Sequence, residues 1–148
     1  MAAEISYSKP VADWETRAFW EGCGRHELVL QRCRDCQVVQ FRPRAICASC
    51  LSSSIEHFVA SGRGTVYTFT VTHQNHLPAF RDACPYVLAY VELEEGPQLM
   101  THIVGCAPTD VRIGMDVQVE FVDLDRDPTK DAARGIDAGT AIPRFRPS

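Results

Sequence analysis

The sequence predicts a mainly β protein with a helical N-terminal arm, a small metal-binding ribbon and a five-stranded barrel. Two observations lead to this prediction. Two CxxC pairs stand close together between residues 33 and 50, and short segments of alternating apolar and polar residues, separated by turns, fill the second half. The first pattern is typical of a cysteine-held ribbon and the second of a small barrel. We assign residues 1–26 to the arm, 27–60 to the ribbon and 61–148 to the barrel domain.

The composition is that of a globular protein. The chain has 148 residues, of which 45% are hydrophobic and 23% charged, and these fractions are typical of soluble domains. No apolar run approaches the roughly 20 residues that a membrane-spanning helix needs. Residues 1–10 lack the basic start and the apolar segment of a signal peptide. We therefore expect a cytoplasmic protein whose thiols stay reduced.

Charge is distributed unevenly along the chain, whose net charge is −4. Residues 17–63 contain seven arginines and four acidic residues, whereas residues 82–137 contain twelve acidic and four basic residues. The ribbon is therefore basic and the barrel acidic. An acidic barrel would repel the phosphates of a nucleic acid, which argues against that class of ligand.

The arm carries a short helix with several aromatic side chains. Asp13 is expected to cap this helix, which would run to about Gly22. Trp14, Phe19 and Trp20 lie within it, and the ribbon is too small to bury all three. An intramolecular core explains part of this aromatic surface. For the arm as a whole, we expect docking on another chain.

The metal site is predicted from Cys33, Cys36, Cys47 and Cys50. A CxxC turn presents two sulfurs from one side, and two such turns facing each other make the tetrahedral cage that zinc prefers. Four protein ligands leave no open position for water, so the metal would be structural. We expect one structural Zn²⁺ per chain.

Disulfides, a redox motif and an iron centre are the alternatives to zinc at these cysteines. Disulfides fit poorly with the expected reducing compartment. A redox CxxC motif needs only one pair and a βαβ pattern beside it, which the sequence lacks. An iron centre stays open, because spacing alone does not distinguish iron from zinc.

Short strands are expected around the two cysteine turns, at residues 28–31, 38–41 and 55–59. Pro43 turns the chain between the second strand and the second cysteine pair. Arginines bracket the metal site, and as a group they are suited to hold a phosphate-bearing ligand. They are Arg32, Arg34, Arg42 and Arg44.

The barrel is predicted after a joint at residues 61–64, where two glycines allow a sharp backbone path. Its expected strands cover residues 65–72, 86–93, 98–104, 117–122 and 141–145. The alternation slips once in the first strand, which predicts a β-bulge. Five short strands match the count of an OB fold. We also expect two helical turns at residues 127–135, between the last two strands.

In their order, these motifs resemble the zinc-ribbon/OB-fold family associated with acyl-CoA metabolism. The motifs are the two CxxC pairs, Phe41-Arg42-Pro43-Arg44, Gly62-Arg63-Gly64-Thr65-Val66-Tyr67, Pro85-Tyr86-Val87, Val91-Glu92-Leu93-Glu94-Glu95-Gly96 and Ile113-Gly114-Met115. The resemblance implies a rubredoxin-like zinc ribbon followed by an OB barrel. It also implies a companion subunit of a thiolase-superfamily enzyme, in which the partner carries out the Claisen, aldol or related chemistry.

The sequence itself contains no evident catalytic constellation. Cys84 precedes a proline and has no neighbouring histidine that would lower the pKa of its thiol. We expect it, like Cys23 and Cys106, to be a buried filler. His73 and His76 lie in a loop that offers neither a carboxylate partner nor further metal ligands.

The resemblance, together with the absence of a catalytic constellation, implies a non-catalytic but required subunit of a thiolase-like acyl-CoA acyltransferase complex, in aromatic, sterol or fatty acyl-CoA metabolism. We expect a hetero-oligomer with the coenzyme A thioester at the interface. The residues expected to contact acyl-CoA or the partner are Trp14, Phe19, Trp20, Arg42, Arg44, His73, His76, Arg81 and Tyr86. The alternatives are a free-standing acyl-CoA-binding protein and a module that binds single-stranded nucleic acid.

Overall fold

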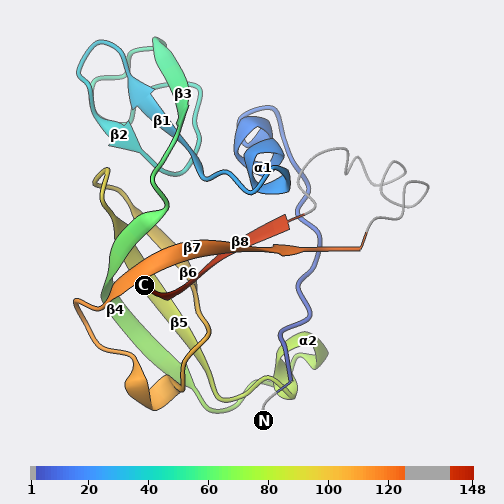
Figure 1. The fold of residues 1–148 in the computed structure, drawn as a ribbon. Helices are drawn as coiled ribbons and strands as arrows, with labels where there is room; N and C mark the ends of the chain where they lie inside the picture. The colour runs from blue at the N-terminus through green and yellow to red at the C-terminus, as the bar shows by residue number, and fades with distance from the viewer. Residues whose placement is uncertain (1–2, 126–140) are drawn as a thin grey trace.

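The computed structural model describes residues 3–125 and 141–148. A small sheet stands on a closed barrel, and a short helix lies beside the junction (Figure 1). The helix expected at residues 127–135 falls outside the described residues. Among the described residues, no helix combines the length and the apolar character that crossing a membrane requires.

The ribbon is a three-stranded antiparallel sheet in the order β2-β1-β3. Its strands are β1 (Val29–Cys33), β2 (Val39–Gln40) and β3 (Ile55–Val59). They match the three strands expected from the sequence to within a few residues. Because β1 is central, the first metal-binding cysteine lies at the end of a strand that is paired on both sides.

The barrel closes in the order β4-β5-β6-β8-β7. Its strands are β4 (Arg63–Thr72), β5 (Tyr86–Leu93), β6 (Gln98–Ile103), β7 (Asp116–Asp123) and β8 (Ala141–Pro147). All pairs are antiparallel except β6 and β8, which pair in parallel and close the barrel. The register of β4 shifts between Val66 and Thr68, which confirms the predicted bulge. The five-stranded OB-type barrel is likewise confirmed.

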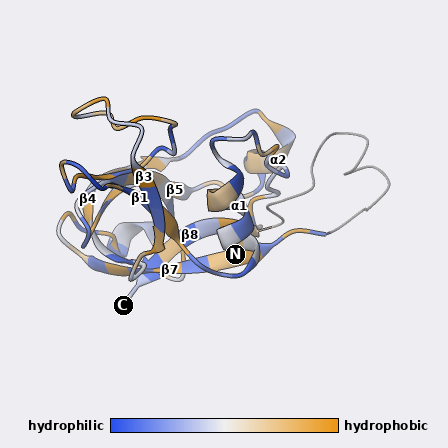
Figure 2. Cartoon of the chain, turned by 90° about the horizontal axis from the view of Figure 1, so that it is seen from above, coloured by the Kyte–Doolittle hydropathy of each residue, from blue (hydrophilic) through white to orange (hydrophobic). Residues whose placement is uncertain are grey.

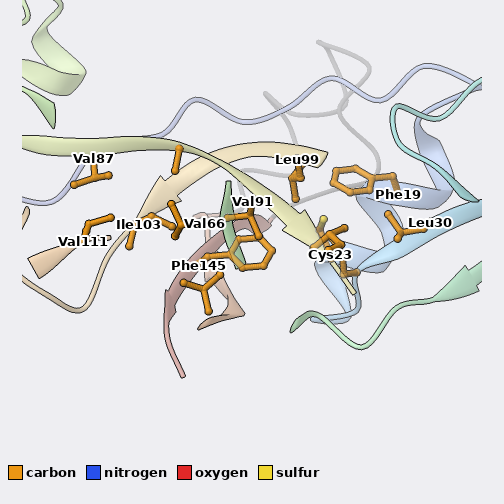
Figure 3. Packing of buried hydrophobic residues seen from close by; sticks show 14 of the residues in the cluster. Phe19, Cys23, Leu30, Val66, Val87, Val91, Leu99, Ile103, Val111 and Phe145 are labelled. Carbon is orange, nitrogen blue, oxygen red and sulfur yellow. The ribbon is translucent and has the colours of Figure 1, made fainter. Parts of the chain in front are cut away.

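One continuous core joins the barrel to the ribbon and to α1 (Arg17–Gly24). Figure 3 shows Phe19, Cys23 and Leu30 beside Leu99, next to the barrel interior around Phe145. Hydrophilic and hydrophobic residues both appear around α1 and along β7 in Figure 2, as expected of elements that have one face in a core. Phe19 is 4% exposed within its own chain, so it belongs to the part of the aromatic surface that packs in the intramolecular core.

The start of α1 also differs from the expectation. The side-chain carboxylate of Asp13 accepts hydrogen bonds from the backbone N–H of Thr16 at 2.8 Å and from its hydroxyl at 2.8 Å. Asp13 therefore closes the turn that precedes the helix, and Thr16 takes the N-cap position itself. The helix begins three residues later than predicted from the sequence and ends two residues later.

The connection between ribbon and barrel is short and closely packed. The N–H of Ala60 donates to the carbonyl of Leu28 at 2.8 Å, and the N–H of Val119 donates to the carbonyl of Gly62 at 2.8 Å. Gly62 has a φ of +74°, and a Cβ at this position would overlap the side chain of Val119. Glycine is therefore required at this joint for both its backbone conformation and its size.

The N-terminal residues start beside α2 (Pro78–Arg81), a short helix that the sequence did not predict, and run along the outside of the barrel towards α1 (Figure 1). The N–H of Ala3 donates to the carbonyl of Asp82 at 2.9 Å, and that of Ser6 donates to the carbonyl of Ala79 at 3.1 Å. A 3₁₀ turn, η1 (Pro108–Asp110), lies between β6 and β7.

Candidate functional site

The four predicted metal ligands converge at one end of the ribbon. The sulfurs of Cys33, Cys36, Cys47 and Cys50 all lie within 4.8 Å of one another. The Sγ atoms of Cys33 and Cys50 are 3.6 Å apart, as are those of Cys36 and Cys47. A tetrahedron with zinc–sulfur bonds of about 2.3 Å has sulfurs about 3.8 Å apart. The four thiolates therefore form a closed site for one structural zinc ion.

The two cysteine turns share one backbone geometry. The N–H of Gln37 donates to the carbonyl of Cys33 at 2.9 Å, and the N–H of Leu51 donates to that of Cys47 at 3.0 Å. Gln37 and Leu51 have φ values of +66° and +64°. Each turn therefore reverses the chain directly after its second cysteine, which directs both of its sulfurs to the same side.

Backbone N–H groups donate to all four sulfurs and favour their ionised form, and at two of them the pKa is lowered as a result. Hydrogen bonds from the backbone of Cys50 and Ser49 lower the pKa of Cys47 to about 7. A hydrogen bond from the backbone of Cys36 lowers the pKa of Cys33. Four thiolates this close repel one another, so full deprotonation requires a cation at their centre.

Two buried glutamines hold the second cysteine turn against the sheet. Gln31 accepts from the N–H of Arg44 at 2.9 Å and donates to its carbonyl at 3.0 Å. Gln40 donates to Gln31 at 2.8 Å and to the carbonyl of Ile46 at 3.3 Å, and it accepts from the N–H of Ala48 at 2.9 Å. The sequence did not predict this network. Its only signal was a glutamine in each of two neighbouring strands.

Four of the predicted contact residues meet in one groove of about 410 Å³, between α1 and residues 41–44. We call it the α1 groove, and the four are Phe19, Trp20, Arg42 and Arg44. The ring of Phe19 lies 4.9 Å from that of Trp20 and 5.3 Å from that of Phe41. The groove therefore has aromatic walls and two guanidinium groups. Asp13, Glu15 and Thr16 line it as well.

Trp14 lies just before α1 and is 74% exposed. The turn that contains it is tied to the ribbon, because Glu15 accepts a hydrogen bond from the N–H of Ala45 at 2.9 Å. Trp14 thus has a largely exposed indole and stands between Asp13 and Glu15, two residues that line the α1 groove.

The remaining predicted contact residues lie elsewhere, around α2 at the far end of the barrel (Figure 1). Arg81 donates to the carbonyl of His76 at 3.2 Å, and Asn75 donates to the hydroxyl of Tyr86 at 2.9 Å. His73 stands in the same loop, after the end of β4. The structure thus divides the predicted set into two groups at opposite ends of the molecule.

A second cluster that sequence reasoning missed joins the arm to the barrel. The hydroxyl of Tyr7 lies 2.9 Å from Nδ1 of His102, and the ring of Tyr86 packs edge-on against that histidine at 5.4 Å. Burial, and then the charge of Arg144, lower the pKa of His102. Burial raises the pKa of Tyr7. Tyr7 and His102 are 95 residues apart in sequence, so no local pattern could have revealed their contact.

The three cysteines outside the metal site differ in burial. Cys23 is fully buried, and burial raises the pKa of its thiol to about 12. Cys84 and Cys106 are half-buried, so the expectation of a buried filler is wrong for these two. Burial and the charge of Asp110 raise the pKa of Cys106. The thiol of Cys84 lies 3.5 Å from the carbonyl oxygen of Phe80 and can donate to it.

Comparison with known families matches both halves of the chain. Residues 20–56 match the rubredoxin-like zinc ribbon domain of ChsH2, and residues 59–122 match the C-terminal OB-fold domain of ChsH2. The boundary between the two matches falls at the joint between β3 and β4.

The relatives of this chain include short and long proteins. A DUF35 domain-containing scaffold protein of Methanocaldococcus jannaschii is 42% identical over 66% of this chain and 69% of its own length. A probable enoyl-CoA hydratase alpha subunit of Thermomonospora curvata is 37% identical over 88% of this chain. A 3-oxo-4,17-pregnadiene-20-carboxyl-CoA hydratase alpha subunit of Mycobacterium tuberculosis is 36% identical over 78% of this chain. The matches span only 37% and 36% of these two subunits.

Two solved structures share the fold. A chain described as Ltp2-ChsH2(DUF35) aldolase is 34% identical, has a TM-score of 0.75, and the match covers 94% of this chain and 98% of that one. A DUF35 protein of unknown function from Sulfolobus solfataricus has a TM-score of 0.57 at 16% identity, covering 73% and 78% of the two chains. The second similarity concerns the fold alone.

Proposed function

We propose that this chain, which belongs to the DUF35 family of zinc-ribbon and OB-fold proteins, is a non-catalytic but required subunit of a complex that acts on acyl-CoA thioesters. The observation that carries the proposal is the match along nearly the whole chain to the Ltp2-ChsH2(DUF35) aldolase structure. The names of the hydratase alpha subunits and of the archaeal scaffold protein support the same class of role.

The partner in this proposal is a thiolase-superfamily enzyme, which supplies the reacting groups. A metal held by four cysteines has no open position, so it organises the ribbon and does not activate a substrate. The pKa of the half-buried Cys106 thiol is raised, which makes this group a poorer source of thiolate at neutral pH. Both features fit a subunit that supplies surfaces rather than chemistry.

The α1 groove is the surface that we assign to the partner and its ligand. Exposed tryptophan and arginine side chains carry a large share of the binding energy in many protein interfaces. Trp14 is 74% exposed beside a groove that contains Trp20, Arg42 and Arg44. The guanidinium groups suit the phosphates of coenzyme A, and the aromatic walls suit its adenine ring.

A second candidate is a hydratase subunit. Two relatives are named as hydratase alpha subunits, and in each the match spans little more than a third of the protein. On this alternative, the chain contributes the same ribbon and barrel to an enoyl-CoA hydratase. The two candidates differ in the reaction of the partner and not in the role of this chain.

The test is to co-express the tagged chain with a thiolase-like or a hydratase-like candidate partner and to purify through the tag. We expect the partner to co-purify and thiolytic cleavage of acyl-CoA thioesters to need both chains. Hydration of enoyl-CoA thioesters by the co-purified pair would favour the second candidate. Failure of a zinc-loaded chain to retain either partner would contradict both.

A pair of variants tests the assigned surface. Trp14→Ala is expected to weaken co-purification strongly, because it removes an exposed indole from the interface. Ile113→Ala serves as the control, because this side chain is 70% exposed but lies in the loop between η1 and β7 and does not line the α1 groove. Equal loss in both variants would contradict the assignment. Titration of the isolated chain with coenzyme A or with an oligonucleotide tests the two partner-free alternatives.

A further inference from the structure

A cleft of about 800 Å³ lies between the N-terminal arm and the barrel, away from the α1 groove. We call it the arm cleft. Its lining includes Ile5, Tyr7, Val87, Ile103, Arg144 and Arg146. Val87 and Ile103 are 2% and 4% exposed, so one wall belongs to the barrel core. The cleft therefore combines an apolar wall with two guanidinium groups, and its size is in the range of small-molecule sites.

The two arginines of the arm cleft share one carboxylate of the barrel. Nε of Arg144 lies 2.7 Å from one oxygen of Glu120, and Nη1 of Arg146 lies 3.7 Å from the other. Both side chains come from β8, and Glu120 comes from β7. Within this group the barrel carries one more positive than negative charge. The side chain of Arg144 is only 17% exposed, so this charge is sheltered from solvent.

The carboxylate that balances this charge comes from the arm. Glu4 approaches Nη2 of Arg144 at 3.8 Å, and its own side chain is 84% exposed. An ion pair that is long and exposed on one side contributes little to stability. Glu4 therefore occupies the position of an anion without being held there tightly.

The backbone around Glu4 is fixed independently of this ion pair. The N–H groups of Ala3 and Ser6 donate to carbonyls next to and within α2 at 2.9 and 3.1 Å, and Tyr7 contacts His102 at 2.9 Å. The arm can thus remain as a wall of the cleft while the side chain of Glu4 rotates into solvent.

We propose that the arm cleft binds a small amphipathic carboxylate whose carboxylate replaces that of Glu4 at Arg144. Its apolar chain would lie along Ile5, Val104 and Pro108, which line the cleft and are partly exposed. We propose an anionic head group for the ligand because the arginines of β8 carry an unbalanced positive charge, and an apolar tail because the cleft has an apolar lining. This site needs no partner enzyme and stands apart from the α1 groove, so it can fail or succeed independently of the proposed function.

The test uses decanoate as the probe and the full zinc-loaded chain, with binding measured by calorimetry. We expect saturable binding, and at least tenfold weaker binding of decanol, because decanol lacks the charge that Arg144 requires. Glu4→Gln removes the competing carboxylate and is expected to tighten decanoate binding about two- to fivefold. This variant leaves the strand pairs of the barrel untouched.

Arg144→Gln is expected to weaken decanoate binding about tenfold or more, since it removes the cation. Its control is Arg63→Gln, which breaks an exposed arginine–glutamate pair with Glu94 outside the cleft. When decanoate is added, the backbone amide NMR chemical shifts that change should be those of residues 83–87 and 103–108. Equal affinity for decanol, shifts centred on the α1 groove, or no binding by either the native chain or Glu4→Gln would each overturn the proposal.

Discussion

The ribbon and the barrel are both small β structures, yet they are held together in different ways. At its metal end the ribbon buries Cys33, Cys47, Gln31 and Gln40, and it leaves several apolar side chains in solvent. Those side chains are Val38, Ile46 and Leu51, which are 39%, 44% and 72% exposed. The barrel instead has a closed apolar interior, although Tyr67, Tyr90 and Met100 on its outside are 55%, 44% and 56% exposed. Examples of interior residues are Val66, Val91, Val117 and Phe145, which are all 1% exposed or less.

The comparison shows how a short segment stays folded without a core of its own. A ribbon of this size cannot bury enough apolar surface to offset its loss of conformational entropy. The metal provides the missing free energy at one end, and the shared core with α1 and the barrel provides it at the other. The two ends of the ribbon should therefore respond to different perturbations.

The largest expected effect is that of breaking the metal site. Cys47→Ser removes one of four ligands, and the structural zinc contributes on the order of 10 kcal/mol to folding. We expect the variant to lose its zinc and the amides of β1 to β3 to lose protection from hydrogen exchange. Barrel amides should stay protected. A variant that kept one zinc per chain and the native melting curve would show that the cysteine cage is wrongly assigned.

The next effect concerns the barrel and leaves the metal in place. Phe145 is fully buried in the core, and replacing a buried phenylalanine by alanine costs about 3–5 kcal/mol. We expect Phe145→Ala to lower the free energy of unfolding by that amount, measured by denaturant titration, with zinc content unchanged. Ile113→Ala, at a side chain that is 70% exposed, should change it by less than about 0.5 kcal/mol. Comparable losses in both variants would contradict the placement of Phe145 in the core.

A smaller effect is expected where the metal site meets the sheet. Gln40→Ala removes the acceptor of the Ala48 N–H, and the loss of one such hydrogen bond costs about 0.5–1.5 kcal/mol. The second cysteine turn should loosen, so zinc should pass to a chelator faster than from the native protein. Gln98→Ala, at an exposed position of β6, is the matched control. If both variants released zinc at the native rate, the glutamine network would have no part in holding the site.

The smallest effect is a dependence on pH at the arm. Burial, and then Arg144, lower the pKa of His102 below its usual 6.5. The folded state therefore binds fewer protons than the unfolded state at this site, and stability rises with pH over that interval. The contribution of neutral His102 to the free energy of unfolding is fully present above pH 6.5. It is lost as the pH falls through the lower pKa that His102 has in the folded state.

The measurement compares unfolding free energies at pH 7.5 and 5.5. Because acid also protonates the zinc ligands, the informative quantity is the difference between the native chain and His102→Gln. We expect the native chain to lose more stability than the variant. An NMR titration that placed the histidine pKa at or above 6.5 would contradict the burial of His102 by the arm.

Much of the fold followed from local patterns. The strands were predicted because alternation, turns and cysteine spacing act over a few residues, and the slip of alternation between residues 65 and 72 became the bulge after Val66. The helix α2 was missed because Pro78–Arg81 is a single turn with no periodicity to detect. The start of α1 was misplaced because Asp13 bonds to Thr16 in a turn outside the helix.

The candidate site was predictable only where its residues share a local motif. The spacing of the four cysteines predicts a tetrahedral metal site, and Arg42 and Arg44 lie close to them in the chain. The division of the contact residues between the α1 groove and α2 depends on the closed barrel, which no spacing reveals. The arm cleft depends on Glu4 meeting Arg144 from the other end of the chain. Pairings over such separations are set by tertiary packing alone.

The joint at Gly62 fixes the orientation of the ribbon relative to the barrel. Hydrogen bonds on both sides of residues 60–62 and the contact with Val119 leave no room for the ribbon to swivel on the barrel. The distance from the indole of Trp14 to the outer face of the barrel is therefore set before any assembly takes place. A larger protein that contacts both Trp14 and the outer face of the barrel finds these two surfaces already at a fixed distance. Once the first contact has formed, the second therefore costs little further orientational entropy.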